Sequence, residues 1–238
     1  MAVLRSFPSQ VFGGPKCSQL TCQAEDLLIG RRACFQIVHD HQLGELERYR
    51  ALVLAGCIAL TDRQIEQIRQ YVSGGGRLCV IGPAATHDQW MNPRPRPALD
   101  DLPASRVVRI PGQEDRLSAI RRACGGQFSL SVEAEPPQTA GAPPAAGQRP
   151  GGLPGLCAEL TEQPGRRLVH LVNYRSDGPV KHIAVRLLLP VGRHVTSITL
   201  ASPERAADRP VPFREEGGAV TFSVPEIGVY EIAVVAMQ

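Results

Sequence analysis

The segment 51–82 constrains the fold more than any other part of the chain. It begins with the apolar run "ALVLA" and ends with the apolar run "RLCVIG". Between these runs, Thr61 and Gln64 have the spacing of a capping box, and a Gly-Gly-Gly run ends the helical pattern that follows. Near-continuous apolar runs are typical of parallel strands covered on both faces. The segment therefore predicts a strand–helix–strand unit of an open α/β sheet with right-handed crossovers.

The rest of the first half continues this alternation. Candidate strands lie at 2–6 and 34–38, and candidate helices at 17–30 and near 113–124. In these helices the apolar residues recur at helical spacing. We therefore expect residues 1–128 to form one α/β domain.

A change of composition divides the chain. The stretch "EAEPPQTAGAPPAAGQRPGGLP" is almost all Pro, Ala, Gly and polar residues, which cannot bury enough apolar surface to fold alone. We assign residues 129–154 to a linker. Beyond it, apolar residues alternate with a period of two, for example from Ile183 to Leu189 and from Val220 to Val224. Six or seven short strands at close spacing predict an antiparallel β-sandwich over 155–238.

Charge and cysteine content exclude several classes of partner. Only Lys16 and Lys181 among the 26 basic residues are lysine, and no basic run is interleaved with aromatics, so nucleic acid is not expected. No apolar stretch reaches the roughly 18 residues of a membrane span. Seven cysteines without a C-x-x-C pair indicate a reducing compartment, and we expect a cytoplasmic protein. No metal-ligand or phosphate-loop spacing occurs, so we expect neither metal nor cofactor.

Cys57 is a candidate nucleophile. It follows the predicted strand 51–55, and α/β enzymes place functional groups beyond the carboxyl ends of such strands. A cysteine nucleophile also needs a base, and none of the histidines (His39, His41, His87) has a spacing that pairs it with Cys57. We favour an inert, buried thiol, with a Cys57-dependent amidotransferase-like or protease-like enzyme as the alternative.

The stretch "THDQWMNPRPRPALDDL", residues 86–102, is the best candidate for a binding loop. It follows the predicted strand 77–82 and should emerge at the carboxyl edge of the sheet. The candidate residues are His87, Asp88, Trp90, Arg94 and Arg96. A tryptophan with Asp and Arg can stack on a sugar and bond its hydroxyls. The alternative, which we favour, is that the loop packs its indole on a neighbouring domain or subunit.

The second half offers fewer candidates. In "HLVNY", His170 alternates with apolar residues of one predicted strand, which favours a structural histidine over a ligand. We expect Tyr174 and Tyr230 to form aromatic ends of the sandwich core.

Two pieces of the first half resemble the class I glutamine amidotransferase-like superfamily. There, "Y-x-x-L-V-L-P-G-G" precedes a helix that ends in "Y-V-x-x-G-G" and then an apolar strand. The matching residues here are Tyr49, Leu52, Val53 and Leu54, and then Tyr71, Val72, Gly75 and Gly76. In catalytic members a cysteine closes the later strand, and here Gly82 stands at that position.

One branch of that superfamily departs in the same way. It is the beta-galactosidase trimerisation domain, which follows the catalytic barrel in family 42 glycoside hydrolases. The chain is similar to that branch over nearly its full length, and its tail, in "HLVNY" and in the final "VP-x-x-x-x-Y", resembles the small β-domain that closes such enzymes. The resemblance implies a flavodoxin-like α/β domain followed by a β-sandwich.

The resemblance also implies a function. In those enzymes the catalytic glutamates lie on an N-terminal (β/α)₈ barrel, which needs about 250 residues and finds no room here. We therefore expect an excised C-terminal part or a stand-alone relative, without catalytic residues. Its expected role is oligomer assembly, with a trimer as first guess and a dimer as second, and it could also shape a carbohydrate cleft beside a barrel. An independent carbohydrate-binding module is the other alternative.

Overall fold

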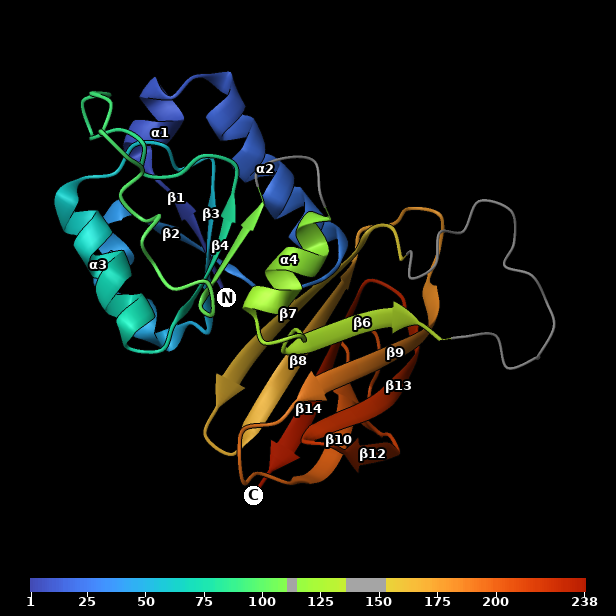
Figure 1. Cartoon of the computed structure of the whole chain (residues 1–238). Coiled ribbons are helices and arrows are strands. Elements are labelled where there is room, and N and C mark those ends of the chain that lie inside the picture. The colour runs from blue at the N-terminus through green and yellow to red at the C-terminus, as the bar shows by residue number, and fades with distance from the viewer. Residues whose placement is uncertain (111–114, 136–152) are drawn as a thin grey trace. The chain divides into compact units, whose positions relative to one another are not determined.

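The computed structural model describes residues 1–110, 115–135 and 153–238 (Figure 1). The chain divides into two compact units. The first, called here the α/β unit, consists of Met1–Leu28 and Phe35–Gln127, and the second, the β unit, consists of Ile29–Cys34 and Phe128–Gln238.

The α/β unit is built on a parallel sheet with helices, as predicted. Its strands are β1 (Ala2–Arg5), β2 (Gln36–His39), β3 (Ala51–Ala55), β4 (Arg77–Ile81) and β5 (Val107–Ile110). They pair in parallel in the order β2-β1-β3-β4-β5. The helical elements are α1 (Phe7–Phe12), α2 (Pro15–Gly30), the 3₁₀ segment η1 (Asp40–Arg48), α3 (Asp62–Ser73) and α4 (Arg116–Ala123). The chain order reverses between β1 and β3, which makes a topological switch point.

The predicted strand–helix–strand unit is confirmed in detail. All five residues of β3 are fully buried, as a central parallel strand requires. At the start of α3 the Thr61 hydroxyl accepts from Gln64 N at 3.1 Å, and the Gln64 side chain accepts from Thr61 N at 2.7 Å. These two bonds complete the capping box, and α3 ends before Gly74.

The β unit consists of antiparallel strands. They are β6 (Leu130–Ala134), β7 (Leu156–Gln163), β8 (Arg166–Asn173), β9 (Val180–Leu188), β10 (Val195–Ala201), β11 (Arg209–Pro210), β12 (Phe213–Glu216), β13 (Ala219–Ile227) and β14 (Tyr230–Met237). One sheet has the order β11-β10-β14-β8-β7 and the other β12-β13-β9-β6. Residues from both sheets, such as Val185, Phe222, Leu171 and Val235, form a single apolar core.

Three observations correct or extend the sequence interpretation of the β unit. Leu130–Ala134, assigned to the linker, form β6, because Leu130 and Val132 alternate into the core and the strand pairs with β9. Residues 136–152, the rest of the linker, lie outside the described residues apart from Glu135, Leu153 and Pro154. Tyr174 is 73% exposed, so it does not close the core; it lies just past the end of β8.

The short segment Ile29–Cys34 joins the β unit through Arg32. This buried guanidinium donates to Val132 O at 2.9 Å and to Leu153 O at 3.0 Å. None of the described helices is long and apolar enough to cross a bilayer.

Candidate functional site at the carboxyl edge of the parallel sheet

Two glycines at the carboxyl ends of β3 and β4 take left-handed backbone conformations. Gly56 has φ of +66° and Gly82 has φ of +72°. A Cβ at Gly56 would lie 2.6 Å from Cys17 O, so the backbone of α2 approaches the end of β3 in a way that only glycine permits. The carboxyl edge is therefore closed tightly beneath α2.

Gly82 occupies the position at which related folds display a nucleophile. A strand-to-helix turn with strained backbone is how such folds expose a catalytic side chain. Here the turn has the positive φ but carries no side chain. A Cβ at this position would lie 2.9 Å from Leu20 Cδ1, so Leu20 of α2 fills the space that a nucleophile would need.

Cys57 lies in the core rather than in an open site. It is 1% exposed, and its Sγ lies 3.6 Å from Leu4 O and 3.9 Å from Ala55 O. Burial raises the pKa of this thiol to about 12. Reactive cysteines are partly exposed and have lowered pKa values. The structure therefore agrees with the inert interpretation and not with a Cys57 nucleophile.

A small network that sequence reasoning missed fixes the segment after β1. Ser6 Oγ donates to Ala59 O at 2.9 Å, and Ser9 Oγ accepts from Ala59 N at 2.9 Å. Ala59 in turn forms a bridge with His87. The network thus ties α1, the loop after β3 and the loop after β4 into one edge. Its only sequence signal is the pair of serines flanking Pro8, which a single chain cannot assign to a distant partner.

Asp88 organises the predicted binding loop. Its carboxylate accepts hydrogen bonds from Trp90 N at 2.8 Å and from Asn92 N and Asn92 Nδ2 at 2.9 Å. The Asn92 side chain, followed by the backbone N–H groups, lowers the pKa of Asp88. Met91 has a positive φ of 65°, which this turn imposes. Asp88 therefore holds the turn that presents Trp90.

Arg94 and His87 also serve the loop itself. Arg94 donates to Leu60 O at 2.9 Å and forms an ion pair with Asp62 at 2.7 Å. His87 Nδ1 lies 2.9 Å from Thr86 Oγ1. These contacts anchor the loop on the start of α3. Whether these residues bind a ligand stays a prediction, as it does for the remaining candidates.

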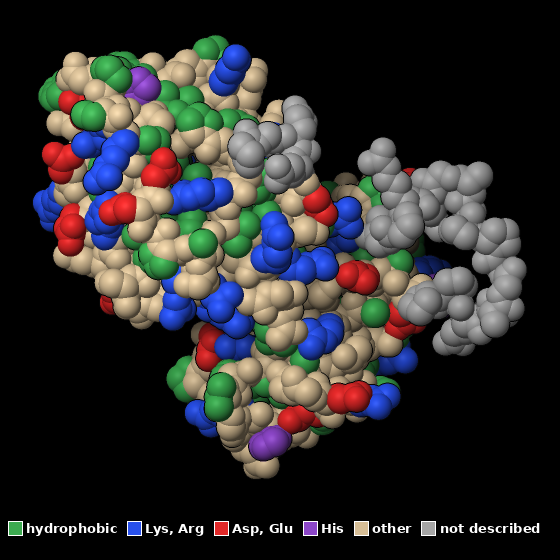
Figure 2. All heavy atoms as spheres, in the orientation of Figure 1, with side chains coloured by type: hydrophobic (Ala, Val, Ile, Leu, Met, Phe, Trp, Pro, Cys, Tyr) green, Lys and Arg blue, Asp and Glu red, His purple; other side chains and the backbone are tan. Residues whose placement is uncertain are grey.

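The two remaining candidates, Trp90 and Arg96, face solvent. Trp90 is 75% exposed, and Arg96 is exposed as well. On the same edge, α1 exposes Phe7, Val11 and Phe12, with the two phenylalanine rings in edge-to-face contact at 6.3 Å. We call Phe7, Val11, Phe12 and Trp90 the edge apolar residues. Figure 1 shows α1 and the green loop after β4 at the same end of the sheet, and Figure 2 shows hydrophobic side chains exposed there.

Asp40 completes this edge. One carboxylate oxygen accepts from Phe7 N at 2.8 Å, which ties the end of β2 to α1. The other oxygen is buried and has no hydrogen-bond partner among the described residues. The negative charge of Asp40 adds to burial in raising the pKa of Cys57. This edge thus combines apolar side chains with one unsatisfied acceptor and lacks an acid–base or nucleophile pair among its described residues.

Comparisons with known proteins give a structural relationship only. No family model and no curated protein matches the sequence. Among solved structures, alpha-L-fucosidase isoenzyme 2 from Paenibacillus thiaminolyticus matches all of this chain with 48% of its own length, a TM-score of 0.63 and 16% identity. A GH42 beta-galactosidase from G. stearothermophilus matches all of it with 40% of its length, a TM-score of 0.59 and 10% identity.

A third neighbour extends this pattern. The GH42 exo-carrageenase from Bacteroides ovatus matches the whole chain with 29% of its length, a TM-score of 0.57 and 9% identity. The chain thus spans less than half the length of each of these three structures. At such identities the likeness shows the fold. It also confirms the coarser part of the resemblance noted from sequence, since GH42 beta-galactosidases and related glycoside hydrolases are structural neighbours of this chain.

Proposed function

We propose that this chain is the non-catalytic C-terminal region of a beta-galactosidase-like glycoside hydrolase, with a role in oligomer assembly. The observation that carries the proposal is the match of the entire chain to part of GH42 enzymes. Both units take part in that match, which favours a shared two-part region over a chance likeness of one common fold. The catalytic barrel of such an enzyme is not part of this sequence.

The strand order supports the finer assignment of the α/β unit. The order β2-β1-β3-β4-β5 is that of flavodoxin-like sheets. The positive φ at Gly82 matches the turn at which amidotransferase-like enzymes carry their nucleophile, and the missing side chain there matches the trimerisation branch. We therefore assign the α/β unit to this branch and regard its edge as structural.

The edge apolar residues are the proposed assembly surface. Monomeric proteins rarely expose contiguous apolar area without a binding role. Four exposed side chains, three of them aromatic, lie on elements that the Ala59 network holds together. Such a surface would pack on a second copy of the chain or on a barrel, and it could shape a carbohydrate cleft there. A trimer is our first expectation and a dimer the second.

The test is sedimentation velocity at micromolar concentration. We expect a species of two or three times the chain mass of 25.7 kDa. The double variant Phe12→Ser and Trp90→Ala should shift it towards the monomer, because both side chains leave the contact. Val191→Ser removes a fully exposed apolar side chain of the β unit and should leave the mass unchanged. A wild-type monomer, or loss of the oligomer in Val191→Ser alone, would contradict the assembly role.

Carbohydrate binding by the loop after β4 is the second candidate function. It is favoured by one observation: Asp88 presents Trp90 on a fixed turn with its indole in solvent. Titration with lactose, followed by Trp90 fluorescence, separates the two functions. Saturable quenching that Trp90→Ala abolishes would support a binding module, whereas an unchanged spectrum leaves assembly as the role of this edge.

A further inference from the structure

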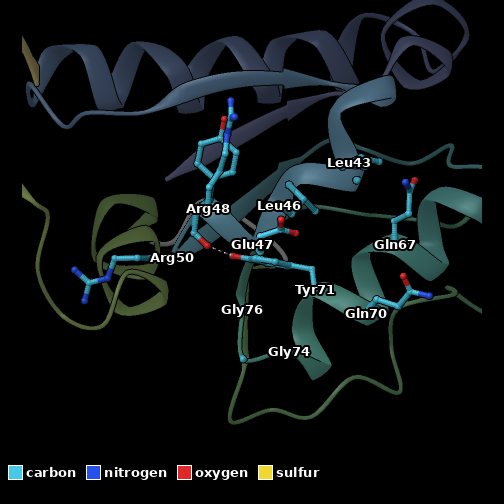
Figure 3. Close-up of a pocket in the computed structure, with 13 residues that line it drawn as sticks. Leu43, Leu46, Glu47, Arg48, Arg50, Gln67, Gln70, Tyr71, Gly74 and Gly76 are labelled. Atoms are coloured by element: carbon cyan, nitrogen blue, oxygen red, sulfur yellow. Dashed lines mark hydrogen bonds between the residues drawn. The ribbon is translucent and has the colours of Figure 1, made fainter. Parts of the chain in front are cut away.

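A cavity of about 590 Å³ opens at the opposite, amino edge of the parallel sheet (Figure 3). It lies between η1 and α3, which lead into β3 and β4 respectively. Its volume falls within the range of about 300–1,000 Å³ that is typical of small-molecule sites. No residue of the candidate site described above lines this cavity.

Tyr71 gives the cavity a rigid aromatic wall. A Cβ at Gly76 would lie only 2.3–2.5 Å from three carbons at the hydroxyl end of the Tyr71 ring, so the ring packs directly on the glycine backbone. The Tyr71 hydroxyl is fixed as well, since it donates to Tyr49 O at 3.1 Å. Because the ring is held at both its face and its hydroxyl, a ligand would meet a preorganised surface at low entropic cost.

The remaining wall offers polar groups rather than apolar ones. Leu43 and Leu46 line the cavity but are almost fully buried, so they present little apolar surface to a ligand. Glu47 and Gln67 line it too, and neither side chain forms a hydrogen bond or ion pair within the described ranges. In Figure 3 the Gln67 and Gln70 side chains extend from α3 on one side of the cavity. An open carboxylate and an open carboxamide are thus available beside an aromatic ring.

The charges argue against an anionic ligand. Arg48 forms an ion pair with Glu45 at 3.1 Å and lies over the Tyr49 ring at 5.4 Å. Arg50 points away from Tyr71, towards the end of α4 in Figure 3, where a Cβ at Gly125 would lie 3.7 Å from its guanidinium. The Glu47 carboxylate, in contrast, is unpaired. An anion would meet this carboxylate without a free guanidinium to offset it.

We propose that this cavity binds a short, uncharged saccharide. Each sugar hydroxyl both donates and accepts, so it can donate to the Glu47 carboxylate while it accepts from the Gln67 amide. An aromatic wall beside such groups provides the apolar contact that a sugar ring needs. The inference does not rest on the assembly role, because it concerns the other edge of the sheet and uses none of the edge apolar residues.

The experiment is a titration of the whole ¹⁵N-labelled chain with lactose and, separately, maltotriose. We expect at least one saccharide to cause saturable shifts of the amides of Gly44, Gly74 and Gly75. Gln67→Ala should weaken that affinity by about threefold to tenfold, as expected for the loss of one hydrogen bond. Gly44→Phe should abolish binding, because a side chain at Gly44 starts 3.6 Å from Gln67 Nε2 and would enter the cavity.

Matched controls keep the result decisive. Arg63→Ala removes an exposed side chain from α3 outside the cavity and should leave the affinity unchanged. Parallel titrations with sulfate and with n-butylamine examine the other ligand classes. Saturation by either of these without saccharide binding would overturn the proposed class. Saccharide shifts confined to the Trp90 loop, or the absence of saturable shifts with both sugars, would overturn the site itself.

Discussion

The two units of the chain handle their polar and apolar groups in opposite ways. In the β unit, polar side chains lie inside: Glu231 is 1% exposed and is held by Arg205, and the buried Asn173 bonds three backbone groups. In the α/β unit, the central strand β3 is entirely apolar, and apolar side chains reach the surface at α1 and Trp90. The comparison indicates that the β unit closes upon itself, whereas the α/β unit leaves one edge for a partner.

The largest expected difference between the units is their response to alkali. Burial raises the pKa of Cys57 and Cys79 in the α/β unit to about 12, and of Cys34 in the β unit to about 11. A raised thiol pKa stabilises the folded state fully below the unfolded value near 9, and this stability is lost as pH rises towards the folded value. Two thiols should cost the α/β unit on the order of 5 kcal/mol between pH 9 and 11.

Pulse proteolysis in urea, with fragments assigned to each unit by mass, measures this effect. The α/β unit should become sensitive at a lower urea concentration as pH rises, and the β unit should change less. The Cys57→Ala, Cys79→Ala double variant should flatten the pH dependence of the α/β unit. Equal losses in both units would break the comparison.

Removing the buried carboxylate should be the most damaging single change in the β unit. Glu231 accepts from both terminal nitrogens of Arg205, at 2.6 and 2.7 Å. Glu231→Ala leaves the partly buried guanidinium without this partner and should cost about 3 kcal/mol in the free energy of unfolding of this unit. The surface pair of Lys181 and Glu226 is the control, and Glu226→Ala should cost less than about 0.5 kcal/mol. Chemical denaturation of both variants decides whether burial sets the difference.

Asn173 should matter less, but in the same unit. Its side chain donates to Gly228 O at 2.7 Å and to Gly178 O at 3.1 Å, and it accepts from Arg175 N at 3.0 Å. Asn173→Ala leaves these backbone groups without that partner, and we expect a loss of about 2 kcal/mol. Asn173→Asp keeps the acceptor and loses the donors, so an equal loss would identify the donor bonds as the important ones. Urea denaturation curves measure both.

The smallest effect concerns the capping box of the α/β unit. Thr61→Ala removes the acceptor for Gln64 N and should cost about 1 kcal/mol. Thr61→Ser retains the hydroxyl and should restore most of the stability. If Thr61→Ala destabilised the β unit as strongly as the α/β unit in pulse proteolysis, the two units could not be regarded as separate.

The parts of the fold that were predictable from sequence are those with local causes. β3 and the Thr61 capping box follow from short-range periodicity and spacing, and the structure contains both as predicted. β6 was assigned to the linker because its two apolar residues adjoin a Pro-rich stretch, and only pairing with β9 makes it a strand. Short helix α1 was missed for a similar reason, since its serines gain their role from Ala59, some fifty residues away.

The candidate site divides along the same line. Sequence located the loop after β4 and the inert character of Cys57, because position after a strand and the absence of a paired base can be read from spacing. It could not assign Asp88 and Arg94 to holding the loop, since their partners are backbone groups brought together by folding. The cavity beside Tyr71 left no local signal either. Gly76 reads as a helix stop, and its contact with the ring appears only in three dimensions.

The turn at Gly82 sets how far this chain stands from thiol chemistry. The backbone already has the left-handed conformation of a nucleophile elbow, and the obstruction is the single methyl of Leu20 at 2.9 Å. Two substitutions, Gly82→Cys and Leu20→Ala, would therefore place a thiol on the elbow without rebuilding the sheet. A base would still have to be recruited, since no histidine bonds to this turn among the described residues. In evolutionary terms, the α/β unit is a few mutations from an enzyme scaffold, while its present sequence keeps that position silent.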